Sequence, residues 1–251
     1  MFTLSEILLL ALIGGWAGAL NAVAGGGTFF TFPMLLFMGV PPIVANATSK
    51  VGLWIGAFGS VRAYMPEIRA AKGLLKPILV VSIVGSVIGS LLLLAISAER
   101  FSAMVPWLLL FATLSFAFGP VLKKRFHRDA AQVKASPLAL GAQGVIGLYA
   151  GFFGAGIGIY MLALFEWMGL KDIHQMNGLK VAAAVGAHTV SALIFIVMGV
   201  VDWPTAIILM ISAALGGYGG AYLAKQLPPL LIRGFVISYG LLVTGYFFFY
   251  A

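Results

Sequence analysis

Residues 7–49 read ILLLALIGGWAGALNAVAGGGTFFTFPMLLFMGVPPIVANATS and contain no charged side chain. A hydrocarbon core about 30 Å thick is crossed by roughly 20 apolar helical residues, so this stretch is too long for one membrane helix. It is interrupted by Gly25-Gly26-Gly27 and by Pro41-Pro42, and glycine and proline favour breaks between helices. We therefore expect a long helix, a short helix and the start of a third helix here.

The rest of the chain has the same character. Of its 251 residues, 62% are hydrophobic and 9% are charged, and the mean hydropathy is +1.08, whereas a soluble domain carries about a quarter charged residues. Residues 1–6 lack the positive start of a secretory signal, so we expect the first helix to remain in the membrane. Further uncharged runs of spanning length cover residues 77–98, 101–122 and 203–224. This pattern predicts an all-α, polytopic membrane protein.

The net charge of +8 is distributed as in membrane proteins. Basic residues gather in residues 62–76, 123–134 and 225–233, whereas the turns near residues 99–100 and 202 carry almost none. Because positively charged loops stay in the cytoplasm, both termini are expected on the periplasmic side. The lipid bilayer is therefore the expected partner, and nucleic acid is not. The chain has no cysteine, which excludes disulfides and thiolate metal sites, and no cofactor is expected.

The chain contains a weak internal repeat. Residues 39–50 match residues 169–180 at a constant offset, and Gly56-Ala57 matches Gly186-Ala187. Each half should contain a long helix, a glycine break, a short helix and three more long helices. The expected domains are a first membrane repeat, a cytoplasmic linker and a second membrane repeat, at residues 1–122, 123–136 and 137–251.

The repeats are expected to be inverted, because the charge pattern places equivalent helix ends on opposite sides. Inversion needs an odd number of crossings in each half, so the short helices would cross with the help of extended glycine segments. The alternative is a re-entrant hairpin with eight crossings. The expected helices cover residues 4–24, 28–39, 42–64, 74–97, 102–122, 137–153, 157–169, 172–198, 203–224 and 229–250.

The two glycine breaks are the strongest candidates for a binding site. Glycine-interrupted helices at matching positions of inverted halves expose backbone groups to a cavity, and the start of a short helix favours an anion. The residues assigned to substrate binding are Gly25, Gly26, Gly27 and Thr28 at the first break, and Gly154, Gly156 and Gly158 at the second. The alternative for these glycines is close helix packing, which we expect at Gly85, Gly89, Gly216 and Gly220.

Lys50 and Lys180 occupy equivalent repeat positions, each about 12 Å inside one end of its helix. They are expected to converge near the midplane, where no acidic residue would pair with them and a bound anion would. The alternative is that each lysine extends to an interface or bonds backbone carbonyls. Polar neighbours share these helices and either bind the anion or bond nearby backbone: Asn46, Thr48, Ser49 and Asn177.

His188 lies two helical turns beyond Lys180 and is a candidate for carrying a coupled proton, because histidine titrates near neutral pH. A structural role is the alternative for this lone side chain.

These motifs resemble the sulfite exporter TauE/SafE family of bacterial membrane proteins. The likeness rests on the first break followed by Pro33, on the stretch Asn46-Ala47-Thr48-Ser49-Lys50, and on the glycines from Gly151 to Gly158, and it covers nearly the whole chain. The resemblance implies export of sulfite or a small organosulfonate such as sulfoacetate across the bacterial inner membrane. In the second half Ala163 stands opposite Pro33 and the glycines are spaced singly, so we expect the second break to bind less directly.

The chain is thus predicted to be a secondary transporter of a small anion that works by alternating access, and it has no ATP-binding P-loop. A membrane channel or a subunit of an export assembly is the alternative. An enzyme is not expected, because the sequence has no HExxH motif and no paired carboxylates, and His127, His174 and His188 are scattered. Assembly of identical chains is left open.

Overall fold

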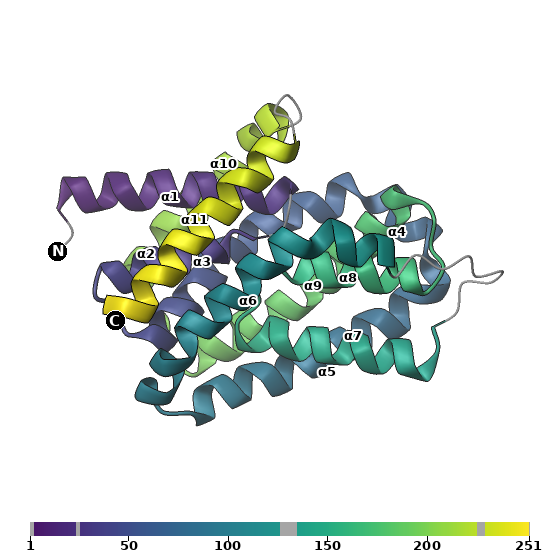
Figure 1. The fold of residues 1–251 in the computed structure, drawn as a ribbon, viewed down its shortest axis with the longest axis horizontal. Coiled ribbons are helices and arrows are strands. Elements are labelled where there is room, and N and C mark those ends of the chain that lie inside the picture. The colour runs from purple at the N-terminus through teal and green to yellow at the C-terminus, as the bar shows by residue number, and fades with distance from the viewer. Residues whose placement is uncertain (1–2, 24–25, 126–134, 225–228, 251) are drawn as a thin grey trace.

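The computed structural model describes residues 3–23, 26–125, 135–224 and 229–250. Within these ranges the protein is all-helical and no strand occurs (Figure 1). The eleven helices of the described residues are α1 (Leu4–Val23), α2 (Thr28–Phe37), α3 (Pro42–Ala63), α4 (Met65–Ala70), α5 (Lys72–Ala95), α6 (Ala98–Arg125), α7 (Pro137–Phe152), α8 (Ile157–Trp167), α9 (Ile173–Val197), α10 (Trp203–Ala224) and α11 (Pro229–Tyr250).

Ten of these helices match the expected ones to within a few residues, and α6 extends furthest beyond its prediction. The helix α4 was not predicted, because its segment was interpreted as a charged loop. Pro66 fits the first turn of a helix, and Glu67 is favourable near the positive helix start. Four helices of the described chain are long and apolar enough to cross a membrane: Leu4–Asn21, Lys72–Ala95, Ala98–Gly119 and Ile173–Val197. The prediction of an all-α polytopic membrane protein is confirmed.

Local sequence signals set several helix ends. Ser136 caps α7 by accepting the N–H of Ala139 at 3.2 Å, and serine is a favourable N-cap residue. Gly39 and Gly169, which are equivalent in the repeat, follow α2 and α8 with φ angles of +79° and +96°. Only glycine adopts this left-handed conformation without strain. The matching glycines of the repeat therefore end its two short helices.

The two halves interlock through glycine contacts. A Cβ atom at Gly216 of α10 would lie 1.9 Å from the carbonyl oxygen of Gly15 in α1, and one at Gly89 of α5 would lie 2.0 Å from that of Leu148 in α7. Such contacts let helix backbones approach closely. The prediction of packing glycines is confirmed for Gly85, Gly89 and Gly216, whereas the surroundings of Gly220 lie outside the described residues.

Each half begins with a helical hairpin. Beside α6, Phe32 of α2 contacts Phe101 with ring centroids 6.2 Å apart, whereas a Cβ at Gly26 would touch Phe116. The helix α2 therefore runs antiparallel to α6, back toward the end of the bundle where α1 starts (Figure 1). With 10 and 11 residues, α2 and α8 are each about 15 Å long, roughly half the thickness of a bilayer core. Each short helix therefore covers only part of the depth of the bundle, and the glycine break at its start lies within the bundle.

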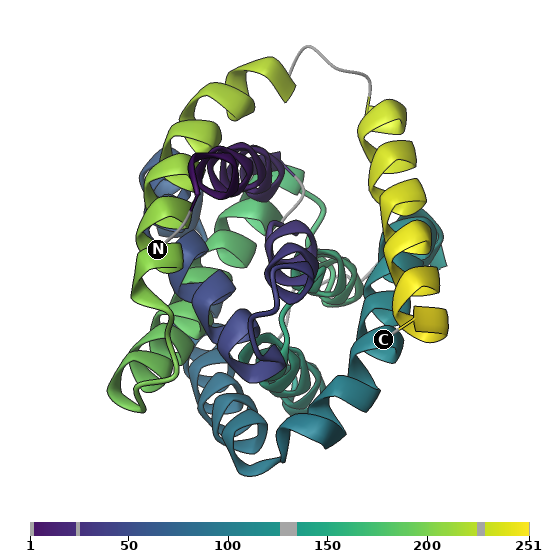
Figure 2. The ribbon, with the colours of Figure 1, turned by 90° about the vertical axis from the view of Figure 1, so that its left-hand side faces the viewer.

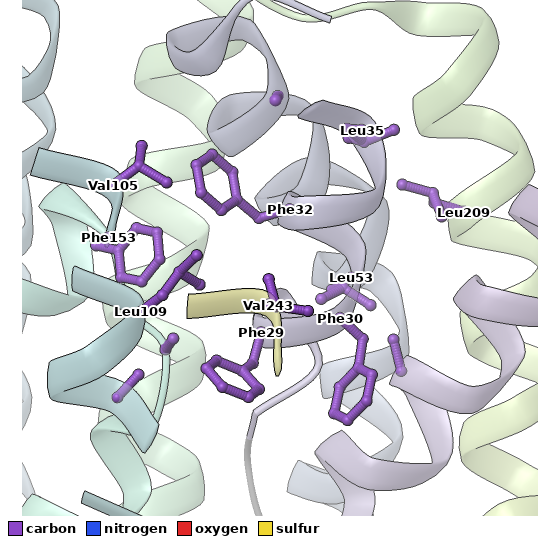
Figure 3. Packing of buried hydrophobic residues seen from close by; sticks show 14 of the residues in the cluster. Phe29, Phe30, Phe32, Leu35, Leu53, Val105, Leu109, Phe153, Leu209 and Val243 are labelled. Atoms are coloured by element: carbon purple, nitrogen blue, oxygen red, sulfur yellow. The ribbon is translucent and has the colours of Figure 1, made fainter. Parts of the chain in front are cut away.

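The core contains side chains from both halves. The helix α2 lies inside the other helices in Figure 2, and Figure 3 shows Phe29 and Phe32 among residues of α3, α6, α10 and α11. Phe153 of the second half contacts Phe32 with ring centroids 5.2 Å apart. Residues of both predicted repeats therefore pack together in the largest of the three hydrophobic clusters of the described residues. The start of α1 and the end of α11 lie at the same end of the molecule (Figure 1).

Candidate functional site

The two glycine breaks meet at one aromatic ring in the middle of α6. A Cβ atom at Gly26 would lie 2.6 Å from Cζ of Phe116, and one at Gly156 would lie 3.7 Å from Cε2 of the same ring. From this level α2 extends along α6 toward Phe101, and α8 extends toward Gly119. The two short helices thus point their N-terminal, positively polarised ends toward Phe116 from opposite sides.

Phe116 carried no signal in the sequence, because it is one of many aromatic residues on apolar helices. Its importance comes from its position between two segments that are far apart in the chain. Gly26, Gly27 and Thr28 are buried around the first break, while Gly25 lies outside the described residues. Gly154, Gly156 and Gly158 are buried at the second break.

The backbone donors of the first break are occupied by Asn21. Its Oδ1 accepts the N–H groups of Gly26 at 3.1 Å and of Gly27 at 3.2 Å. Thr31, one turn into α2, bonds to Ser49 of α3. A neutral amide oxygen thus lies where an anion would have to bind. Asn21 was not among the residues assigned to substrate binding, although an asparagine four residues before a glycine run is a recognisable local capping signal.

The second break is arranged differently. Gly154 and Gly156 have φ angles of +89° and +78°, so both positions require glycine. The described hydrogen bonds include no acceptor for the backbone N–H groups of Ala155 and Gly156. We expected the second break to bind less directly, but its donors are the less occupied of the two sets. The single spacing of the glycines produces this geometry, because residues with φ > 0 alternate with Ala155.

Lys50 and Asn46 of α3 bind the end of α7, next to the second break. The Lys50 ammonium donates to the carbonyl oxygen of Ala150 at 2.8 Å and to that of Gly151, and Asn46 Nδ2 donates to the carbonyl of Phe152 at 2.7 Å. A cation is favourable at the negative end of a helix dipole. A Cβ at Gly154 would lie 3.6 Å from Lys50 Cε, so the charge is adjacent to the break.

The Lys50 side chain is 4% exposed and its Nζ lies 5.4 Å from the ring centroid of Phe195 in α9. This distance permits a cation–π contact. Within the described chain, no carboxylate forms an ion pair with Lys50. Its bonds to carbonyls agree with the alternative role that the sequence allows for this lysine, which is to bond backbone carbonyls. They leave the positive charge without an anionic partner.

Lys180 does not converge with Lys50. Its ammonium donates to Asn177 Oδ1 at 2.8 Å on the same helix. Phe195, which contacts Lys50, lies about 22 Å farther along α9 than Lys180, at about 1.5 Å per residue. The expected convergence is therefore not what the structure shows. The helices α3 and α9 pack antiparallel. Residues that are equivalent in the internal repeat therefore lie side by side only at the point where the two helices cross.

The other predicted polar residues lie at different distances from the breaks. Thr48 accepts the backbone N–H of Asp202 at 2.9 Å, and so binds the turn between α9 and α10. Ser49 bonds to Thr31 of α2. His188 is half-buried on α9 and lies within electrostatic range of Lys50.

A buried group of serines supports the end of α7. Ser86 of α5 donates to the carbonyl of Ala187 at 2.7 Å and bonds to Ser191 of α9 at 2.7 Å. Ser90 Oγ lies 3.0 Å from Ser191 Oγ and 3.4 Å from the carbonyl oxygen of Gly151, and its single proton is donated to one of these two acceptors. Sequence reasoning missed this group. Its signal is the spacing of Ser82, Ser86 and Ser90 on one face of α5.

Comparisons with known proteins agree over most of the chain. It is 28% identical to a "Probable membrane transporter protein" of Haemophilus influenzae, over 95% of this chain and 93% of the relative. It is 28% identical to "Probable membrane transporter protein YfcA" of Escherichia coli K12, over 94% and 88%, and 30% identical to "Probable membrane transporter protein ORF9" of Sinorhizobium sp, over 86% and 84%. No solved structure matches it significantly.

The family description "Sulfite exporter TauE/SafE" matches residues 10–247. This range contains both glycine breaks, Lys50 and the serine group on α5. The chain belongs to the sulfite exporter TauE/SafE family.

Proposed function

We propose that this membrane transporter exports a small anion, either sulfite or a small organosulfonate such as sulfoacetate, across a bacterial inner membrane by alternating access. The observation that carries the proposal is the meeting of two helix N-termini at Phe116, with the Lys50 ammonium beside the second break. The membership of a transporter family confirms the prediction that the chain is not an enzyme.

The charges at this place favour an anion. Each helix N-terminus acts as roughly half a positive charge, and Lys50 adds a full one. The described residues place no carboxylate against this ammonium, and an uncompensated buried charge is costly. A bound anion would supply the missing negative charge. The ligand must also be small, since Gly26 and Gly156 leave little room beside Phe116.

We place the anion at the second break in the described conformation. The N–H groups of Ala155 and Gly156 have no acceptor among the described hydrogen bonds, and the Lys50 ammonium bonds carbonyls next to this break, whereas Asn21 occupies the donors of the first break. Alternating access would release Asn21 when the two hairpins move relative to α6. The two breaks would then differ in occupancy between the two conformations.

We further propose that the halves are inverted repeats with both termini in the periplasm. Supporting contacts come in equivalent pairs: α1 packs along α10, and its counterpart α7 packs along α5. Relative to α6, α2 runs antiparallel while its counterpart α8 runs parallel. Opposite directions of equivalent helices are what inversion requires.

Counterflow in liposomes tests the transport proposal. Purified protein is reconstituted, and exchange of radiolabelled sulfite and sulfoacetate is measured with sulfate and acetate as competitors. We expect saturable exchange that is competed by sulfonates and strongly reduced in Lys50→Gln, while Lys180→Gln serves as the matched control. Exchange that does not saturate would favour a channel, and no exchange of either anion would contradict the proposal.

A further inference from the structure

Building on the proposed function, we infer that the transported anion carries its own hydrogen-bond donor, an O–H or N–H group, and that Asn46 Oδ1 accepts it. The site would thus select hydroxylated, aminated or protonated anions, among them sulfite in its singly protonated form, over anions such as sulfoacetate that only accept hydrogen bonds.

The inference starts from an unpartnered oxygen. Asn46 is 0% exposed, and its Nδ2 donates to the carbonyl of Phe152 at 2.7 Å. Its Oδ1 is buried and has no hydrogen-bond partner among the described residues. Buried side-chain acceptors are rarely left without a donor, because they lose their bonds to water.

Reversing the amide does not remove this need. Exchanging the two atoms would place Oδ1 against the Phe152 carbonyl oxygen, so that two acceptors would face each other. The Phe152 bond therefore fixes the orientation, and Oδ1 remains the acceptor. Both atoms belong to one planar carboxamide, so Oδ1 lies at the same end of α7 as the second break.

The surroundings place this acceptor beside positive donors. Lys50 follows Asn46 by one helical turn and donates to carbonyls of the same helix end. The second break adds the N–H groups of Ala155 and Gly156. A ligand here meets several donors and one lone acceptor. A sulfonate or sulfite group suits the donors, and a donor on the same ligand suits Asn46.

A pair of anions with equal charge and similar size tests this directly. Isethionate is 2-hydroxyethanesulfonate, and ethanesulfonate lacks only the hydroxyl group. Calorimetric titration of the purified full chain should give about tenfold tighter binding of isethionate, the effect of one satisfied buried hydrogen bond. Glycolate and acetate form a second pair, which should show the same preference with a carboxylate in place of the sulfonate.

Variants then assign the preference to one residue. Leucine has nearly the same shape as asparagine, so Asn46→Leu should bind isethionate and ethanesulfonate with about equal Kd. The control Asn177→Leu, at the far end of α9, should retain the preference for isethionate. The wild-type comparison needs no variant, so it remains decisive even where Asn46→Leu fails to fold.

The outcomes separate the two proposals. Equal binding of isethionate and ethanesulfonate to the wild-type chain overturns the role of Asn46 and leaves the anion transporter standing, as would occur if a water molecule satisfied Oδ1. A preference that persists in Asn46→Leu also overturns the assignment. If neither sulfonate binds, the proposed selectivity fails, whereas the proposed function fails only if neither sulfite nor sulfoacetate shows saturable counterflow.

Discussion

Replacing Lys50 with methionine removes one positive charge from the second break while keeping an unbranched side chain of similar length. Lys50 is 4% exposed, and its ammonium bonds the carbonyls of Ala150 and Gly151 and lies 5.4 Å from the Phe195 ring centroid. A hydrogen bond to a charged group contributes roughly 1.5–3 kcal/mol. If the anion makes one such bond to Lys50, its loss should weaken sulfite binding by about 2 kcal/mol, or about 30-fold in Kd.

The fold should survive this change better than binding does. The variant loses the bonds to Ala150 and Gly151, but it no longer buries a charge, and these two effects oppose each other. Thermal unfolding in detergent should therefore show a modest shift in Tm, while calorimetry with sulfite shows the large change in Kd.

Lys180→Met provides the matched comparison. Because Lys180 lies about 22 Å along α9 from Phe195, which Lys50 contacts, its charge contributes little to an anion at the second break. We expect a Kd within about twofold of the wild type. Unchanged sulfite affinity in a folded Lys50→Met protein would refute the reasoning, as would an equal loss in both variants, since equal losses require the lysines to share one site.

Three further substitutions, one of them with a matched control, probe the packing around the breaks. Gly89→Ala places a methyl group about 2 Å from a backbone oxygen of α7 and should lower the free energy of unfolding by roughly 1–3 kcal/mol. The control Gly245→Ala, with nothing within 4 Å, should be neutral, and equal Tm values for the two variants would argue against the close crossing. Asn21→Ala releases the two N–H groups of the first break and should lower stability by about 1 kcal/mol without changing sulfite binding at the second break. Tighter sulfite binding would place the anion at the first break, because the released donors would then bind it. Ser191→Ala removes bonds to two serines of α5 and should lower the free energy of unfolding by about 1 kcal/mol. A denaturation midpoint like that of the wild type would show that the serine group does not stabilise the fold.

The sequence alone determined the class of the protein and most of its helices. Uncharged runs of bilayer length and their interruption by glycine and proline are local properties, so ten helices and the packing role of Gly85, Gly89 and Gly216 could be predicted. The helix α4 could not be predicted in this way, because a short charged segment has too weak a local pattern.

Only the tertiary structure decided which residues meet. Phe116 lies between the two breaks, a role that is not visible in the order of residues. Asn21 occupies one set of backbone donors, which its local capping signal alone did not establish. The repeat made Lys50 and Lys180 appear to be partners, yet Lys50 contacts Phe195, which lies about 22 Å from Lys180 along α9. The positions of basic residues indicate in which direction the helices run. Contacts between distant segments depend also on where the helices cross, and no local pattern in the sequence encodes the crossing points.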